Sequence, residues 1–204
     1  MDADEFLKRK WTHAFNLLFV RGADKELEWS DFERFVQEVK AQRGRYSRDY
    51  ALAERAMRSV WEGLVKFDRN GDNKARVDTT CGIHDSHDRL QVSIDEWHDM
   101  WMEYRANGKS AAGESGDWQH CYLQYIFQLM DTQGDRQIDK YEFSEVMDYY
   151  NVPHKRSLAA FEKMAKFPVD YQRFCALWSQ YFLSTDERAP GTNLFCFATD
   201  DCEK

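Results

Sequence analysis

Four apolar pairs with the same five-residue spacing constrain this chain more than any other feature of its sequence. The pairs are Leu27 and Phe32, Val92 and Trp97, Ile138 and Phe143, and Val169 and Phe174. After each pair, apolar residues continue at helical spacing. Before each pair lies a polar stretch, and before that stretch another run of residues has apolar side chains at helical spacing, which form a stripe. These stripes end at Phe19, Phe67, Met130 and Phe161. A generic helical bundle would not give four stripes one common offset, so the sequence predicts four helix-loop-helix units.

The loops of these units have the pattern of the EF-hand, in which the aliphatic residue at loop position 8 pairs with its counterpart in the neighbouring hand. We therefore expect an all-α fold of four EF-hands in two pairs, compact, with short paired loop strands. Only 3 Pro and 10 Gly in 204 residues also favour helix. The expected division is 1–106 for hands one and two, 107–116 for a small and polar linker, 117–183 for hands three and four, and 184–204 for a C-terminal tail.

The third loop, residues 131–142, carries oxygen-bearing side chains where calcium ligands are needed. Ca²⁺ takes roughly six to eight oxygens, which a twelve-residue loop supplies from positions 1, 3, 5, 7, 9 and 12. The residues at these positions are Asp131, Gln133, Asp135, Gln137, Asp139 and Glu142. Gln137 would contribute its backbone carbonyl and Glu142 both carboxylate oxygens. The sequence therefore predicts calcium as the cofactor and this loop as the main site.

Two residues of the third loop depart from the usual pattern. Gln133 is neutral and longer than the common Asp or Asn, and Arg136 replaces the glycine of the sharp turn. A left-handed Arg136 would add strain of about 1 kcal/mol. We expect a dissociation constant of roughly 10⁻⁷ to 10⁻⁵ M, with Mg²⁺ as a competitor.

The second hand has the ends of a calcium loop but too many residues between them. Residues 75–91 appear as an insertion, because 29 positions separate the two ends inclusively where twelve are expected. The candidate ligands of this second set are Asp68, Asn70, Asp72, Lys74 and Glu96. The insertion contains Cys81, His84, Asp85, His87 and Asp88, a mixture that suggests zinc but lacks a recognised ligand spacing, so a solvated loop is favoured.

The first and fourth loops lack the ligands that a calcium site needs. Val20 and Gly22 occupy the first two ligand positions of hand one. In hand four Lys166 and Arg173 stand at positions 5 and 12, where their positive charges would repel Ca²⁺. We expect both hands to serve as structural partners.

Charge and composition narrow the function further. The formal net charge of −8 disfavours both a nucleic-acid surface and recruitment to anionic lipid. No signal peptide or membrane-spanning run is evident, which predicts a cytoplasmic protein without a transmembrane segment. We also expect a monomer. The five cysteines are odd in number and form no C-x-x-C pair, which favours free thiols. No nucleophile and base show a recognised local signature, so an enzyme is not expected.

The chain resembles the invertebrate sarcoplasmic calcium-binding proteins, especially the calexcitin branch. The resemblance is carried by residues 27–32, 131–135, 138–140, 177–182 and 191–195. It implies a tail that packs on the helices near residues 193–197, and calcium buffering or signalling in excitable cells. It departs at the second loop, at the first ligands of hand one and after Cys196.

Two functions follow as expectations. The first is a cytosolic calcium sensor or buffer acting through hand three, and through hand two if its loop closes, with a calcium-dependent protein target if it is a sensor. The alternative is an EF-hand scaffold that holds an apolar small molecule, as luciferin-binding proteins and photoproteins of the same scaffold do. Aromatic residues, 15% of the chain, are the basis for this alternative, although they more often form core.

Overall fold

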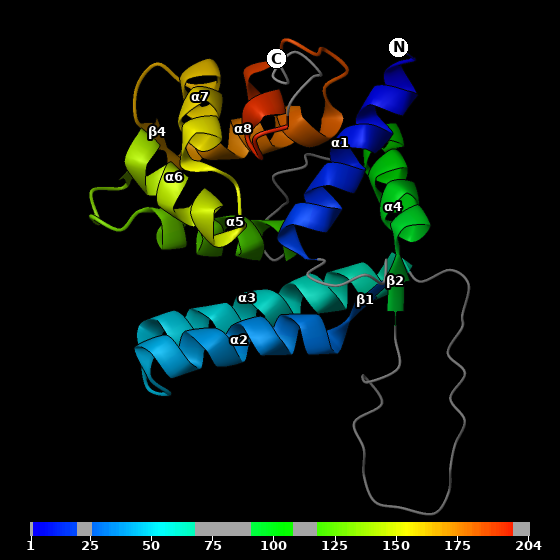
Figure 1. The fold of residues 1–204 in the computed structure, drawn as a ribbon. Helices are drawn as coiled ribbons and strands as arrows, with labels where there is room; N and C mark the ends of the chain where they lie inside the picture. The colour runs from blue at the N-terminus through cyan, green and yellow to red at the C-terminus, as the bar shows by residue number, and fades with distance from the viewer. Residues whose placement is uncertain (1, 20–25, 68–90, 108–117, 198–204) are drawn as a thin grey trace, which may run out of the picture.

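The computed structural model describes residues 2–19, 26–67, 91–107 and 118–197. Its elements in hands one and two are α1 (Ala3–Leu18), β1 (Glu26–Glu28), α2 (Trp29–Arg43), α3 (Arg48–Leu64), η1 (Val65–Phe67), β2 (Gln91–Ser93) and α4 (Ile94–Ala106). Hands three and four contain α5 (Trp118–Met130), β3 (Gln137–Ile138), α6 (Lys140–Tyr149), α7 (His154–Met164), β4 (Val169–Asp170) and α8 (Tyr171–Leu183), followed by η2 (Pro190–Asn193). The predicted all-α class is confirmed (Figure 1).

Two short antiparallel ribbons join the hands as the sequence predicts. β1 pairs with β2, which sets Leu27 opposite Val92, and β3 pairs with β4, which sets Ile138 opposite Val169. All four residues are buried. Ladders of two or three residues are too short to be stable alone, so helix packing must hold each pair together.

The start of β2 corrects one boundary of the sequence analysis. Gln91, assigned to the end of the insertion, is the first residue of β2 and lies opposite Glu28. Gln137 begins β3 in the same way, and both residues lie five positions before the carboxylate at loop position 12. Gln91 therefore takes loop position 7, where the sequence analysis had put Lys74. Lys74 and residues 75–90 of the predicted insertion lie outside the described residues.

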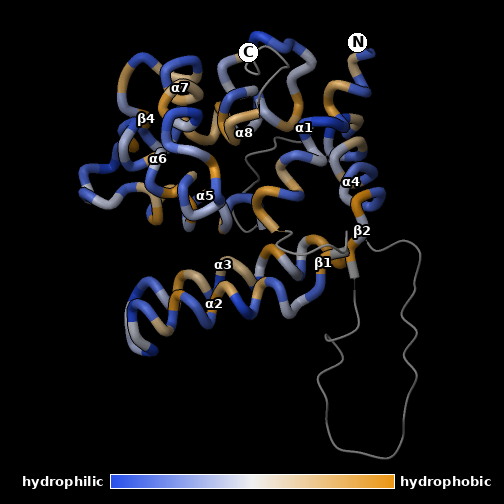
Figure 2. The backbone as a smooth tube through the Cα atoms, viewed as in Figure 1, coloured by the Kyte–Doolittle hydropathy of each residue, from blue (hydrophilic) through white to orange (hydrophobic). Residues whose placement is uncertain are grey.

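One continuous core connects the two pairs of hands. Trp11, Trp97, Trp101 and Trp178 are almost fully buried within it. The ring of Trp101, on α4, stacks on Phe182, on α8, with centroids 3.9 Å apart. Figure 2 shows the apolar stretches of the helices where the elements meet. The shared core explains why the molecule is compact.

Helix α1 is fastened to α4 and α8 by buried hydrogen bonds as well as by packing. The Trp11 indole donates to the Phe182 carbonyl at 2.9 Å, and the Tyr181 hydroxyl donates to the Lys10 carbonyl at 2.7 Å. The Trp97 indole donates to the Trp11 carbonyl at 3.0 Å. The first and last helices of the chain are thus one structural unit.

The end of the described chain packs on this unit. Residues 194–197 are buried, and Phe195 makes edge-on ring contacts with Trp178 and Tyr181. His13 bonds the Phe195 carbonyl through Nε2 at 2.8 Å, and Arg156 donates to the Cys196 carbonyl at 2.8 Å. The segment named by the family resemblance therefore contacts α1, α7 and α8.

The described cysteines are Cys121, Cys175 and Cys196, and each is a free thiol. Burial raises the pKa of Cys196 to about 12, so this thiol is unreactive at neutral pH. Among the described helices, none has the combination of length and apolarity that crossing a bilayer requires.

Candidate metal centre

The four loops end in the same local structure. The residue at loop position 9 is the N-cap of the exiting helix in each hand, namely Glu28, Ser93, Asp139 and Asp170. In three hands a carboxylate at position 12 accepts a hydrogen bond from that N-cap amide, which completes a capping box. These carboxylates belong to Asp31, Glu96 and Glu142. In these three hands the capping bond holds the position-12 carboxylate at the start of the exiting helix. Hand four differs, because a cation, Arg173, stands at its position 12.

Glu142 links the beginning of the third loop to its end. One carboxylate oxygen, Oε1, accepts hydrogen bonds from the Gln133 amide at 3.0 Å and the Thr132 hydroxyl at 3.1 Å. The other, Oε2, accepts from the Asp139 amide at 3.0 Å. The residue is only 4% exposed. The contact of Thr132 could not be predicted from the sequence, because loop position 2 supplies no ligand and no pattern marks it.

Asp131 contributes a buried oxygen that has no donor. Its Oδ2 accepts from the Arg136 amide at 3.0 Å. Its Oδ1 is buried and forms no hydrogen bond with the described residues. Burying a carboxylate oxygen without a donor is costly, and a bound cation would remove that cost. This orphaned oxygen at loop position 1 fits a calcium site.

The other predicted ligands lie along the same loop and contact its backbone. Asp135 accepts from the Gln137 amide at 2.9 Å, and Asp139 accepts from the amides of Tyr141 and Glu142 at 2.7 and 2.9 Å. Within the described part of the chain, no three His, Cys, Asp or Glu side chains converge as a metal cluster. Ion binding therefore requires some of these hydrogen bonds to be exchanged for metal contacts.

The backbone turns sharply at two positions of this loop. Gly134 has φ 73° and Arg136 has φ 66°, both in the left-handed region. The left-handed Arg136 that the sequence analysis considered is thus present, at a cost of about 1 kcal/mol. The turn is made in spite of the missing glycine, because the Arg136 amide is held by Asp131.

Comparisons with known proteins agree with this description. No family model matches the chain. Calexcitin-1 of Caenorhabditis elegans is 29% identical over 204 residues, which covers 95% of this chain and 88% of the relative. This similarity over most of both chains supports the resemblance to calexcitin-like EF-hand proteins.

Solved structures share the fold of this calexcitin-like protein. A sarcoplasmic calcium-binding protein from amphioxus has a TM-score of 0.68 at 22% identity, covering 96% of this chain and 98% of that one. A Streptomyces coelicolor calcium-binding protein has a TM-score of 0.60 at 16% identity, covering 86% and 97%. The coelenterazine-binding protein of Renilla muelleri has a TM-score of 0.55 at 14% identity, covering 95% and 96%. At these identities the likeness concerns the fold alone.

The second candidate set of this calexcitin-like protein is described only at Glu96. This glutamate is 7% exposed, and its Oε2 accepts from the amide and the hydroxyl of Ser93, each at 2.9 Å. Its predicted companions Asp68, Asn70, Asp72 and Lys74 lie outside the described residues, as do the cysteine and histidines considered for zinc. Glu96 thus has the same capping role as Glu142, and the set stays a prediction.

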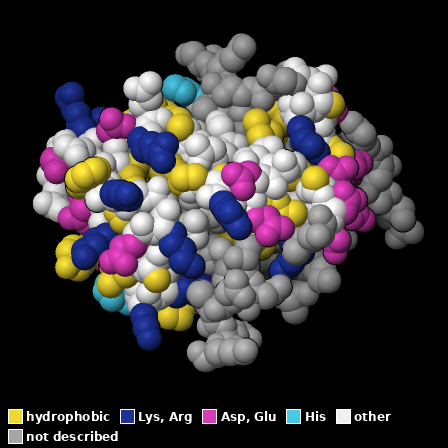
Figure 3. Space-filling view, turned by 90° about the horizontal axis from the view of Figure 1, so that it is seen from above, with side chains coloured by type: hydrophobic (Ala, Val, Ile, Leu, Met, Phe, Trp, Pro, Cys, Tyr) yellow, Lys and Arg dark blue, Asp and Glu magenta, His cyan; other side chains and the backbone are white. Residues whose placement is uncertain are grey.

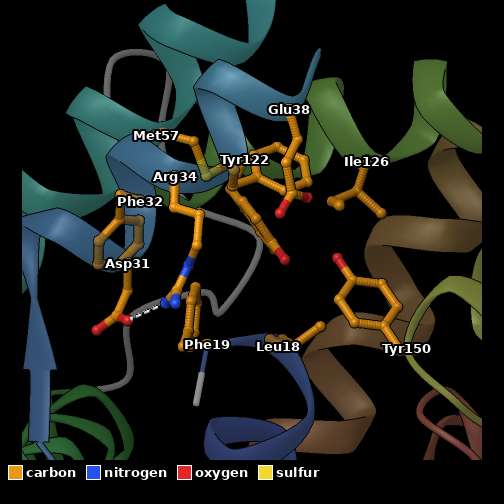
Figure 4. Close-up of a pocket in the computed structure, with 11 residues that line it drawn as sticks. Leu18, Phe19, Asp31, Phe32, Arg34, Glu38, Met57, Tyr122, Ile126 and Tyr150 are labelled. Carbon is orange, nitrogen blue, oxygen red and sulfur yellow. Dashed lines mark hydrogen bonds and ion pairs between the residues drawn. The ribbon is translucent and has the colours of Figure 1, made fainter. Parts of the chain in front are cut away.

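Hands one and four depart from a metal site in different ways. In hand one Asp31 forms an ion pair with Arg34 at 2.6 Å, while Val20 and Gly22 lie outside the described residues (Figure 4). In hand four Lys166 and Arg173 are exposed, and Phe167 is 78% exposed at loop position 6. Both loops therefore serve as strands for their neighbours through β1 and β4.

A narrow cleft lies where the ends of α1 and α6 meet α2, α3 and α5. Phe19, Phe32, Met57, Tyr122 and Tyr150 line much of it, and Figure 4 shows Arg34 and Glu38 beside them. Its volume is about 40 Å³. That space is far below the several hundred Å³ of a typical organic-ligand pocket, roughly 300–1,000 Å³.

Proposed function

We propose that this calexcitin-like protein binds calcium ions through the loop from Asp131 to Glu142. The observation that carries the proposal is the buried, donor-free Oδ1 of Asp131 in a loop that Glu142 already spans. Calcium prefers such hard oxygen ligands. The amphioxus protein of similar fold is a sarcoplasmic calcium-binding protein, which supports the same ligand here.

The residues of the loop would hold the ion in distinct ways. Asp131 would offer the oxygen that now lacks a donor, and Asp135 and Gln133 would add side-chain oxygens. Gln137 would add its backbone carbonyl, and Asp139 would act directly or through water. Glu142 would exchange its bonds to Thr132 and Gln133 for metal contacts, while capping of α6 by Asp139 keeps its backbone in place.

Calorimetric titration with Ca²⁺ tests this proposal directly. We expect binding with a dissociation constant of roughly 10⁻⁷ to 10⁻⁵ M, and a loss of at least about tenfold in Glu142→Gln, which removes one charged ligand oxygen. Glu145→Gln is the matched control, because Glu145 is exposed on the same helix and outside the loop. The absence of calcium heat, or equal affinities of the two variants, would refute the assignment.

A second ion in hand two is a separate proposal with its own readout. Glu96 has the capped geometry of Glu142, which supports it as a position-12 ligand. Counting bound calcium in wild type and in Glu96→Gln distinguishes two sites from one. An unchanged stoichiometry in Glu96→Gln would remove hand two from the proposal.

We further propose a binding protein of the cytoplasm, acting as a monomeric sensor or buffer rather than as an enzyme. Fluorescence of an apolar probe separates the two roles, because a sensor exposes apolar surface when it binds calcium and a buffer changes little. Repeating the titration with millimolar Mg²⁺ measures its competition for the site. The calcium target, if the protein is a sensor, would bind the surface that this probe detects.

The small-molecule alternative receives less support. The coelenterazine-binding protein shares the fold at 14% identity, which does not carry its ligand to this chain. In the described core the aromatic rings pack on one another, and the apolar cleft of about 40 Å³ cannot admit an organic ligand of that class. Calcium binding is therefore the function that the geometry supports best.

A further inference from the structure

A basic segment interrupts the acidic surface at the turn between α2 and α3. Residues 40–48, which we call the α2–α3 tip, contain four cations and no carboxylate, in a chain of net charge −8. Two of them, Lys40 and Arg43, lie in the last turn of α2, where positive charge is favourable beside the helix C-terminus. The helix C-terminus does not explain the other two cations, Arg45 and Arg48. Arg45 follows the end of α2, and Arg48 is the first residue of α3, where positive charge is not favoured.

The α2–α3 tip exposes an aromatic ring to solvent, with one arginine beside it. Tyr46 is 93% exposed, and the Arg45 guanidinium lies 5.6 Å from its ring centroid. Arg43 approaches Asp49 at 3.6 Å, but both side chains are at least 60% exposed, so this pair holds the arginine weakly. Neither Arg45 nor Arg48 forms an ion pair with any described residue. Within the described part of the chain, no carboxylate therefore neutralises these two charges.

The α2–α3 tip is a fixed protrusion. It closes the hairpin of two long helices at its left end in Figure 1. Gly44 turns the chain with φ 88°, and Ser47 caps α3 by accepting from the Tyr50 amide at 3.1 Å while donating to the Gly44 carbonyl at 2.8 Å. The exposed ring of Tyr46 is therefore held by a turn whose backbone is fixed by hydrogen bonds. This limits the conformational entropy that the turn would lose when a partner binds.

We propose that the α2–α3 tip docks this protein onto an anionic phospholipid surface. Arginine binds phosphate with two parallel hydrogen bonds, and a tyrosine ring with a polar hydroxyl suits the headgroup layer. A headgroup layer is soft and accepts a convex protrusion, whereas a folded acidic protein would need a matching hollow. The shape of the α2–α3 tip therefore favours a membrane surface over a folded acidic protein.

The acidic charge of the rest of the protein does not prevent this contact. Charges more than about 10 Å from the lipid are largely screened at 0.1 M salt. The face drawn in Figure 3 shows basic and acidic side chains intermixed, with acidic ones gathered along one edge. Only charges within this distance act on the headgroups, and at the α2–α3 tip four cations outnumber the flanking carboxylates of Glu38 and Asp49.

Co-sedimentation with vesicles tests the proposal. The probes are vesicles of 70% phosphatidylcholine and 30% phosphatidylserine, against vesicles of phosphatidylcholine alone, at about 0.1 M salt with a calcium chelator. We expect binding to the anionic vesicles only. Each cation at a surface of this kind contributes about fivefold in affinity, so Arg45→Gln/Arg48→Gln should bind about 25-fold more weakly. Tyr46→Ser should weaken binding further.

The matched control is Lys155→Gln/Lys163→Gln, which removes the same charge from exposed positions on α7. It should bind as the wild type does. Circular dichroism of each variant shows whether the fold is kept. Equal loss in both double variants, equal binding to neutral vesicles, or stronger binding to immobilised poly-glutamate than to the anionic vesicles would overturn the proposal. Because calcium is chelated, the result is independent of the calcium site.

Discussion

Replacing Lys10 by methionine should stabilise this protein at neutral pH. Lys10 lies on α1, is fully buried, and donates from Nζ to the Ser184 carbonyl at 2.7 Å. Its ammonium also lies 4.7 Å from the ring centroid of Phe6. Burial nevertheless lowers the pKa of Lys10 from 10.5 to about 8, although the charge of Asp186 acts in the opposite direction. The protein therefore maintains a buried charge at a net cost.

The size of that cost follows from the pKa. At 1.36 kcal/mol per pKa unit, a fall from 10.5 to about 8 corresponds to about 3 kcal/mol lost from folding stability at pH 7. Methionine keeps a similar buried stem, and the Ser184 carbonyl loses one donor. We expect Lys10→Met to raise the free energy of unfolding by about 2 kcal/mol, or the melting temperature by about 4–8 °C in a chain of this size.

The pH dependence gives a second, independent signature. Below pH 8 the lysine is protonated in both states, so the full cost is present. Between pH 8 and pH 10.5 the folded protein releases this proton before the unfolded chain does, so wild-type stability rises with pH relative to the variant. The advantage of Lys10→Met should shrink across that range.

Urea unfolding at pH 7, 9 and 10 measures both signatures. Lys8→Met on the exposed side of α1 is the control and should change stability by less than about 0.5 kcal/mol. If Lys10→Met were destabilising at pH 7, or if its advantage stayed constant up to pH 10, the reasoning about burial would be wrong.

Three further predictions concern packing, strain and protonation. Gly63→Ala should destabilise the protein by about 1–3 kcal/mol, because the added Cβ would lie 2.3–2.7 Å from side-chain atoms of Trp118. Urea unfolding measures this loss, and an unchanged midpoint would contradict the tight approach of α3 to α5. Arg136→Gly should stabilise the third loop by up to about 1 kcal/mol, since glycine adopts φ 66° without strain; a lower melting temperature would argue against that strain. Stability should fall between pH 7 and pH 5, because burial lowers the pKa of His13 and His98 below 6.5 and the unfolded chain then takes up protons first. His13→Gln/His98→Gln should flatten this slope in denaturant titrations, and an identical slope would exclude these two groups.

The repeat of apolar residues was sufficient to predict the local structure. The residues expected at loop position 8 pair as predicted, Leu27 with Val92 and Ile138 with Val169, because a ladder register depends on a short local pattern. The assignment of the third loop as the calcium site is a prediction of the same kind, since its ligand spacing is local. The left-handed conformation of Arg136 followed from its place in that spacing.

Contacts between distant segments could not be derived in this way. The insertion boundary was one position wrong at Gln91, because the pairing partner that fixes it, Glu28, lies 63 residues away in the chain. The bond from Thr132 to Glu142 also lay outside the ligand pattern.

The sequence by itself determined four helix-loop-helix units, their pairing and the loop with the best ligand set, since each depends on residues close together in the chain. The tertiary structure alone decided that Asp131 keeps a donor-free oxygen, that Lys10 is buried beneath the end of α8, and that the α2–α3 tip stands exposed. These properties depend on which surfaces meet across as many as 174 residues, as Lys10 and Ser184 do, and a local pattern carries no information at that separation.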